Sequence, residues 1–185
     1  MENTNKSNRK NIAIGILKES VTLLNTIKKN PTQGFDLIFT GDFITVDHII
    51  LCDLIPLLPT PVRAFYFMEN NLLSTAIFSC CAKRYILPNA RISLKEHPGT
   101  VRVDPQQLIR EPDLRAHTEA KKEINDQLIR ILAKNTGKSE EEIRIRVKKN
   151  PIMSAEEAIE FGIADEIFTD MNIFISSDSP NEENP

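Results

Sequence analysis

The stretch from Lys83 to His97 contains two short apolar runs on either side of a Pro-Asn turn. The first run spans residues 85–87 and ends at Pro88 and Asn89. Residues 91–95 then alternate polar and apolar side chains, which is the period of a strand with one buried face. The pattern predicts two strands that pair as a β-hairpin, and it requires neighbouring elements that cover their apolar side.

Strand-like and helix-like patterns alternate in the chain before this stretch. Strands are predicted at residues 11–17, 35–40 and 62–68, and helices at residues 18–28, 44–58 and 71–82. Alternation of this kind predicts crossover connections around a mainly parallel sheet with helices outside it. The predicted fold class is therefore α/β.

One long, charged helix is predicted at residues 113–134, and its apolar stripe is formed by Ile124, Leu128, Ile131 and Leu132. A helix of that length spans about 33 Å, more than one face of a small domain covers. We therefore expect the helix to project, with the stripe exposed for a partner.

Local signals delimit the helices that follow. Asn135-Thr136-Gly137 predicts the end of the long helix. Capping boxes are predicted at the start of two shorter helices, and Gly162 is predicted to close the second. The boxes consist of Ser139 with Glu142 and Ser154 with Glu157.

Composition excludes several classes of protein. The 185 residues are 41% hydrophobic and 26% charged, which fits a soluble domain with a substantial core. The net charge of -3 disfavours a nucleic-acid surface, and no apolar run approaches the roughly eighteen residues of a membrane span. Residues 1–10 lack the apolar core of a secretory signal and are expected to form a mobile arm. A cytoplasmic protein with a disordered acidic tail at residues 176–185 is predicted.

The chain contains three cysteines, Cys52, Cys80 and Cys81. Their number is odd, their surroundings in the sequence are apolar, and their spacing is not that of metal ligands. We interpret them as buried small hydrophobic residues with no redox role. No metal and no cofactor are predicted.

The sequence Lys-Arg-Tyr-Ile-Leu-Pro-Asn-Ala-Arg-Ile at residues 83–92 resembles the segment that leads to the catalytic histidine in the ClpP family of self-compartmentalised serine peptidases. Residues 132–137 are similar to the end of that family's handle helix. Residues 153–158 and 161–167 are similar to its C-terminal helix and last strand. The resemblance is specific from about Lys83 to Phe168 and weaker over residues 36–82.

This resemblance implies a ClpP/crotonase-like fold of repeated β-β-α units with a mainly parallel sheet and a projecting handle helix. One domain is expected over residues 11–175. Its head would comprise residues 11–97 and 139–175, and its handle residues 98–138. In the family, the handle interlocks two heptameric rings back to back.

The resemblance also implies that the catalytic positions are vacant. A Ser-His-Asp peptidase needs a nucleophile, a base and a carboxylate that orients the base. The serine position, counted forwards from Asp36 and backwards from Arg84, holds Leu72. Lys95 stands at the histidine position and Asn150 at the aspartate position. All three roles therefore lack the required side chain.

The oxyanion hole is expected to be altered as well. The family's Gly-Gly pair is matched by Asp42 and Phe43, so the donor positions would fall at Phe43 and Leu73. A carboxylate near the hole opposes the negative charge that develops there, and a phenyl ring crowds the space that glycine leaves open.

An alternative alignment, in which the catalytic positions of the family are shifted by two residues along this sequence, would restore a possible nucleophile and base. It would pair Ser74 with His97, or Ser74 with Lys95, as an unorthodox serine peptidase site. On the helix, a shift of two residues turns the side chain by about 200° around the helix axis. On the strand, the same shift moves the side chain by about 7 Å along the strand. The shifted nucleophile and base would therefore not face each other. His48 and His117 are interpreted as solvated or core-edge residues.

Two classes of function follow. The first is a catalytically inactive, ClpR-like subunit that forms homo- or hetero-oligomeric heptameric or tetradecameric rings with ClpP-type subunits. It would modulate an active partner or the docking of an AAA+ unfoldase. The second is an enzyme, either the unorthodox peptidase or a crotonase-like acyl enzyme, although the sequence lacks the paired glycine-rich oxyanion loops that coenzyme A substrates need. Neither nucleic acid nor membrane is an expected partner.

Overall fold

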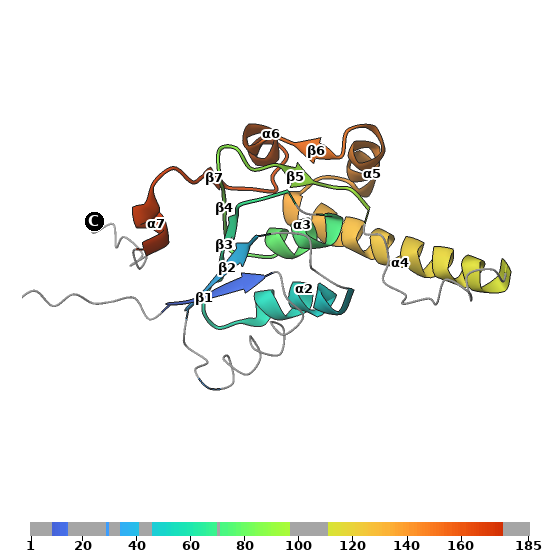
Figure 1. Ribbon diagram of the computed structural model, residues 1–185, viewed down its shortest axis with the longest axis horizontal. Coiled ribbons are helices and arrows are strands. Elements are labelled where there is room, and N and C mark those ends of the chain that lie inside the picture. The colour runs from blue at the N-terminus through green and yellow to red at the C-terminus, as the bar shows by residue number, and fades with distance from the viewer. Residues whose placement is uncertain are drawn as a thin grey trace, which may run out of the picture.

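The computed structural model describes residues 9–14, 29, 34–40, 46–69, 71–96 and 111–175 (Figure 1). Five of its strands form one sheet in the order β1-β2-β3-β4-β7, and every neighbouring pair is parallel. These strands are β1 Arg9–Ile14, β2 Gly34–Phe39, β3 Arg63–Tyr66, β4 Lys83–Ile86 and β7 Glu166–Ile167. The predicted α/β class with a mainly parallel sheet is confirmed.

Helical segments connect the strands. Three short segments stand between β2 and β3, namely η1 Val46–Ile49, α2 Ile50–Leu54 and η2 Ile55–Leu57. The continuous helix predicted there is interrupted because Pro56 has no N–H to continue the ladder of α2. Helix α3 Leu72–Ser79 connects β3 to β4. The described residues after β5 also form α4 Glu111–Thr136, α5 Glu140–Lys149, α6 Ala155–Glu160 and α7 Met171–Ile175.

The N-terminal strand begins earlier than the sequence pattern indicated. β1 starts at Arg9, inside the segment expected to be a mobile arm, and pairs with β2 along its whole length. The helix predicted at residues 18–28 and the tail predicted at residues 176–185 lie outside the described residues.

The hairpin predicted around Pro88 and Asn89 is wrong in its pairing. Both strands exist, but β5 Ile92–Ser93 pairs antiparallel with β6 Ile152–Met153 and not with β4. β4 is already bonded on both sides, to β3 and to β7, so it has no free edge for β5. The Pro-Asn turn therefore carries the chain from the large sheet into a second, two-stranded sheet. Repeated β-β-α units stay a prediction.

The large sheet is covered on both faces, because successive strand side chains point to opposite sides. Ala64 and Tyr66 of β3 belong to the main core cluster with residues of α2 and α3. Phe65 points the other way, and its ring stacks on that of Tyr85 with centroids 4.9 Å apart. Phe168 completes this second cluster.

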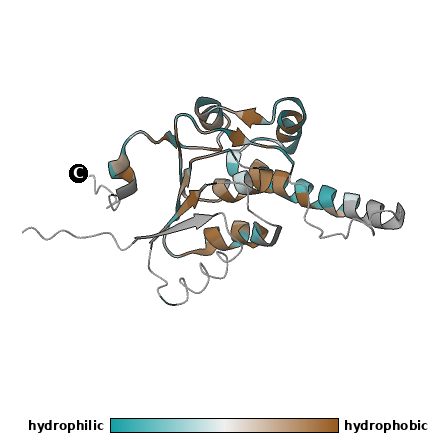
Figure 2. Ribbon diagram, in the orientation of Figure 1, coloured by the Kyte–Doolittle hydropathy of each residue, from teal (hydrophilic) through white to brown (hydrophobic). Residues whose placement is uncertain are grey.

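Helix α4 has 26 residues and is about 39 Å long. Its N-terminal half extends beyond the other described elements, whereas its C-terminal half packs against α3 and α5 (Figure 1). Figure 2 shows the hydrophobic residues of α4 in the packed half. Leu128 and Leu132 are 0% and 1% exposed. The prediction of an exposed stripe is therefore wrong, since the four residues of the stripe lie in or against the core of the head.

The predicted helix ends are confirmed. Ser139 and Glu142 form a capping box at α5, and Ser154 and Glu157 form one at α6. Gly137, after α4, and Gly162, after α6, have φ values of 73° and 85°, which suit residues without a Cβ. Within the described ranges, no helix is both long and apolar enough to cross a membrane.

Candidate functional site

The candidate site lies at the start of α3, just beyond the carboxyl end of β3. Ligand sites of open α/β sheets occur at this edge of the strands. Asn71 is the N-cap of α3, and its side-chain oxygen accepts hydrogen bonds from the backbone N–H groups of Leu73 (3.0 Å) and Ser74 (3.1 Å). Leu72 is the first residue of the helix.

The fold brings the three positions predicted for a triad to one place. The backbone N–H of Leu72 donates to the carbonyl oxygen of Lys95 at 2.9 Å. Lys95 follows β5, and the β5–β6 ladder continues with a bond from the N–H of Leu94 to the carbonyl oxygen of Pro151. This antiparallel register sets Lys95 opposite Asn150. Residues that are far apart in the sequence therefore meet at one end of the small sheet.

Their side chains do not form a relay. Leu72 is 0% exposed and belongs to the main core cluster. Lys95 is exposed, and its ammonium nitrogen lies 2.9 Å from the Oε1 atom of Glu69. Asn150 is the exposed C-cap of α5, and its backbone N–H donates to the carbonyl oxygen of Arg146 at 3.0 Å. The site thus contains a buried aliphatic side chain and a surface ion pair.

The backbone amide predicted as an oxyanion donor already has a partner. The N–H of Leu73 donates to the Asn71 side chain, and the Leu73 side chain is buried in the core. A donor held this way is turned toward its own helix cap. Asp42 and Phe43, the residues of the other predicted donor position, lie outside the described residues.

The residues of the shifted-register alternative have other partners. Ser74 is fully buried, and its Oγ lies 3.4 Å from Oδ1 of Asn71. Lys95 is directed to Glu69 at the surface. His97 lies outside the described residues. Of the other histidines, His48 is buried in η1, and the side chain of His117 is not described.

Sequence reasoning missed Glu69 and the role of Asn71. Asn71 carried a local signal, because asparagine directly before an apolar helix is a common N-cap. Glu69 carried none, since its partner Lys95 is brought near only by the fold.

A second ion pair, Lys121 with Glu96 (3.6 Å), joins α4 to the segment after Lys95. In the described ranges, no group of three or more His, Cys, Asp or Glu side chains could hold a metal ion.

The chain is similar to a known protein family. The family model for Clp protease matches residues 73–171, more than half of the 185 residues. The match begins at the second residue of α3 and ends at the first residue of α7. It therefore covers Leu73, Ser74, Lys95 and Asn150, and it starts one residue after Leu72.

Proposed function

Because the chain belongs to the Clp protease family, we propose that it is a ClpP-like subunit without peptidase activity of its own, comparable to ClpR-type subunits. The observation that carries this proposal is the burial of Leu72 at the start of α3. The nucleophile of a serine peptidase must be reachable by the substrate and must carry a hydroxyl group that a base can activate. Leu72 has neither property, and its backbone N–H is bonded to Lys95.

The surroundings of Leu72 support the same conclusion. Lys95 offers no imidazole to accept a proton, and its ammonium group is paired with Glu69. Asn150 offers no carboxylate to balance a charged base. The Leu73 amide, which would stabilise an oxyanion, is held by Asn71. Catalysis by a triad and an oxyanion hole needs these parts together, because the members act as a unit.

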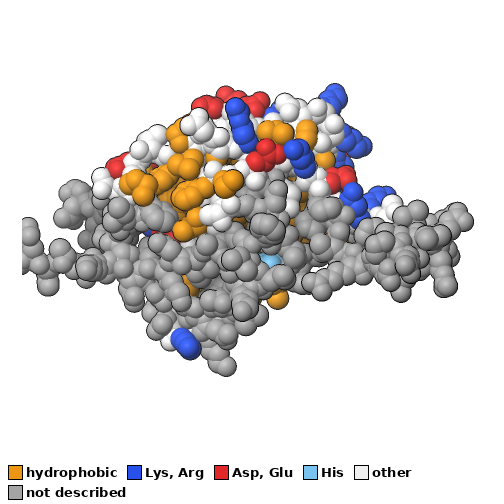
Figure 3. Space-filling model, in the orientation of Figure 1, with side chains coloured by type: hydrophobic (Ala, Val, Ile, Leu, Met, Phe, Trp, Pro, Cys, Tyr) orange, Lys and Arg blue, Asp and Glu red, His pale blue; other side chains and the backbone are white. Residues whose placement is uncertain are grey.

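Assembly is the function that we propose for the parts that remain. Clp protease family membership supports oligomers of ClpP-type subunits, and we propose that this chain enters mixed rings and modulates an active partner or the docking of an AAA+ unfoldase. Large apolar side chains exposed on the described surface support contacts with other subunits, and Figure 3 shows hydrophobic side chains among the charged ones. The exposed large hydrophobic residues of the described chain include Leu57, Met68 and Met171, which are 77%, 56% and 59% exposed.

The test compares the chain alone with the chain purified together with an active ClpP-type subunit from the same cells. Alone, it should hydrolyse no fluorogenic peptide and should not be labelled by a fluorophosphonate, which requires an activated hydroxyl. In the copurified sample, native mass spectrometry should find both subunits in one ring, and the label should be confined to the partner.

Two controls separate the alternatives. Stoichiometric labelling of this chain that disappears in Ser74→Ala would contradict the proposal and support the shifted-register peptidase. If the chain assembles with no ClpP-type subunit of the same cells, the proposed role in mixed rings is contradicted. The labelling experiment alone then decides whether the chain lacks peptidase activity.

A further inference from the structure

The sheet face opposite the main core carries a cluster of aromatic rings. Phe65 of β3 stacks on Tyr85 of β4, and the ring of Phe168 meets that of Phe65 edge to face with centroids 5.4 Å apart. Phe67 is half-buried beside them, with its ring 6.5 Å from that of Phe168. Among the described residues, Ile173 of α7 is the helical residue that packs against this cluster. Helix α7 therefore covers part of the aromatic face.

Ile173 holds α7 to the sheet in two ways. Its side chain packs on the rings, and its backbone carbonyl oxygen accepts a hydrogen bond from Nη1 of Arg63 at 3.1 Å. Carbonyl groups at the end of a helix lack a partner within the helix, and a nearby cation also interacts favourably with the helix dipole. A helix of five residues is not stable by itself in water, so the order of α7 depends on such contacts.

The connection from the sheet to α7 is short and exposed. The N–H of Phe168 donates to the carbonyl oxygen of Ile86 at 2.7 Å, which fixes Phe168 to β4. Thr169 and Asp170 follow, and both are exposed. Asp170 accepts its bonds from the first turn of α7 itself. A backbone rotation at Thr169 and Asp170 can therefore move α7 while the hydrogen bonds of the sheet stay intact.

We propose that α7 is a reversible strap, which closes the aromatic face through Ile173 and opens it when the short helix is released. Release would expose the rings of Phe65 and Tyr85, and exposed apolar patches of this kind mark surfaces that bind other proteins. The strap thus controls whether the face is accessible. The family match ends at Met171, so the rest of α7 lies beyond it. The inference is independent of the proposed function, because its tests need no ClpP-type partner.

The affinity that such a strap requires follows from its attachment. A segment on a short flexible linker has an effective concentration on the order of 1 mM. A strap that is closed about ten times as often as it is open therefore needs a Kd of about 0.1 mM or lower when the same segment is a free peptide. In the unmodified chain the attached strap competes, so the free peptide should bind about tenfold more weakly.

The experiment uses the full chain and a labelled synthetic peptide with the sequence of residues 169–176, and fluorescence polarisation measures binding. Ile173→Asp should release the strap, because a carboxylate loses hydration when it packs on aromatic rings. This variant should bind the peptide with a Kd of about 0.1 mM or lower, and a peptide that itself carries Ile173→Asp should not bind. Met171→Asp, at an exposed position of the same helix, is the matched control and should bind as weakly as the unmodified chain. Equal binding by the unmodified chain and Ile173→Asp, or no binding by Ile173→Asp, would overturn the proposal.

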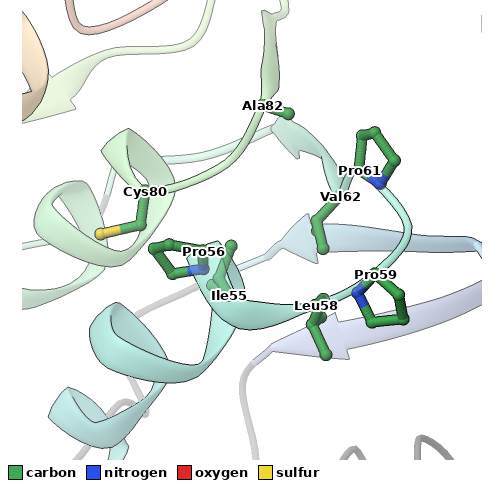
Figure 4. A pocket seen from close by; sticks show the side chains of 8 residues that line it. All are labelled: Ile55, Pro56, Leu58, Pro59, Pro61, Val62, Cys80 and Ala82. Carbon is green, nitrogen blue, oxygen red and sulfur yellow. The ribbon is translucent and has the colours of Figure 1, made fainter. Parts of the chain in front are cut away.

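A second apolar opening needs its own control. A surface pocket of about 240 Å³ lies between the end of α3 and residues 55–62 (Figure 4). Its lining residues Ile55 and Val62 belong to the main core cluster and not to the aromatic cluster. Pro59 also lines the pocket and is exposed, so adding Pro59→Asp to Ile173→Asp should leave peptide binding unchanged. Loss of binding in the double variant would place the peptide in this pocket and contradict the strap.

Hydrogen exchange of the unmodified chain gives a result that depends on no variant. The amides of α7 should exchange through a local opening that exposes little surface, so their exchange should change little at low urea concentrations. The amides of β3 and β4 should exchange through a larger opening that urea promotes strongly. If the amides of α7 exchange in step with those of β3 and with the same dependence on urea, α7 is a fixed part of the head and the proposal fails.

Discussion

The backbone N–H of Leu72 donates a hydrogen bond to the carbonyl oxygen of Lys95, with 2.9 Å between the two atoms. This bond holds the first residue of α3 against the end of β5, so the positions predicted for a nucleophile and its base are adjacent. Only the backbones of Leu72 and Lys95 are adjacent, and their side chains point in different directions. Leu72 enters the core, and Lys95 reaches Glu69 at the surface.

Restoring a hydroxyl at this position should not restore catalysis. Leu72→Ser would place the hydroxyl in the core and remove a fully buried leucine, so the free energy of unfolding should fall by about 3 kcal/mol or more. Urea unfolding followed by circular dichroism measures the loss, and fluorogenic peptides measure activity. Hydrolysis that a fluorophosphonate blocks would show that the side chain is accessible and that the site is competent.

The buried ion pair of Asp36 and Arg63 joins β2 to β3 and is expected to stabilise the part of the sheet that contacts α7. The guanidinium group of Arg63 donates two hydrogen bonds to the Asp36 carboxylate, at 2.8 and 2.7 Å, and a third to the carbonyl oxygen of Ile173 at 3.1 Å. Asp36→Asn would remove a negative charge from beside a buried guanidinium group and should lower the free energy of unfolding by about 3 kcal/mol or more. Hydrogen exchange should also become faster in α7.

The matched control is the ion pair of Lys83 and Glu166, which also joins neighbouring strands but is exposed. Glu166→Gln should change the free energy of unfolding by less than about 1 kcal/mol. Equal losses in Asp36→Asn and Glu166→Gln would contradict the argument from burial.

Acid should weaken the contact between β4 and the segment before β7. Burial opposes ionisation of Asp165, but hydrogen bonds and the positive charge of Arg84 outweigh it, so the pKa of Asp165 lies below its usual value. A folded-state pKa below the unfolded value stabilises the fold at higher pH. That stabilisation is complete above the unfolded pKa of about 3.9 and is lost as the pH falls through the lower folded value.

Asp165→Asn should therefore reduce stability at neutral pH and flatten its decline below about pH 4. Urea unfolding at a series of pH values measures both effects. Glu123→Gln, at an exposed carboxylate of α4, is the control for the loss of a surface carboxylate and should leave the stability at neutral pH unchanged. An unaltered acid slope in Asp165→Asn would show that other carboxylates cause the decline.

Local signals allowed much of the fold to be predicted from the sequence. Apolar runs located the strands of the large sheet, and capping residues such as Ser139 and Gly137 located helix ends, because caps depend on neighbours in the chain. Pairing was less predictable. The partner of β5 is β6, which lies about sixty residues further along the chain, and alternation within β5 carries no information about which strand it meets.

In the candidate site, too, local sequence predicted the residue types but not the contacts that depend on tertiary packing. Residue types at Leu72, Lys95 and Asn150 were evident from the sequence, and the fold brings these positions together. The ion pair of Lys95 with Glu69 depends on tertiary packing. The prediction that the cysteines are buried is confirmed for Cys52 and Cys81, whereas Cys80, at the end of α3, is half-buried.

The last prediction concerns assembly through α4. Leu128 lies in the core of the chain itself, so Leu128→Asp should unfold the head and cannot report on contacts between rings. The part of α4 that extends from the head carries few apolar residues, and Leu114 is the only large one between Glu111 and Glu123. We expect Leu114→Asp to weaken the contact between two rings while leaving circular dichroism and the melting temperature unchanged.

Sedimentation velocity and native mass spectrometry of the mixed assembly provide the measurement. If the proposed contact between rings includes this half of α4, the unmodified chain should be found in double rings and Leu114→Asp in single rings, because a charge must be desolvated when it enters a buried contact. Leu128→Asp is the contrasting variant, which should lower the melting temperature first. Double rings that persist in Leu114→Asp at the unmodified concentration would exclude this half of α4 as the ring-to-ring contact.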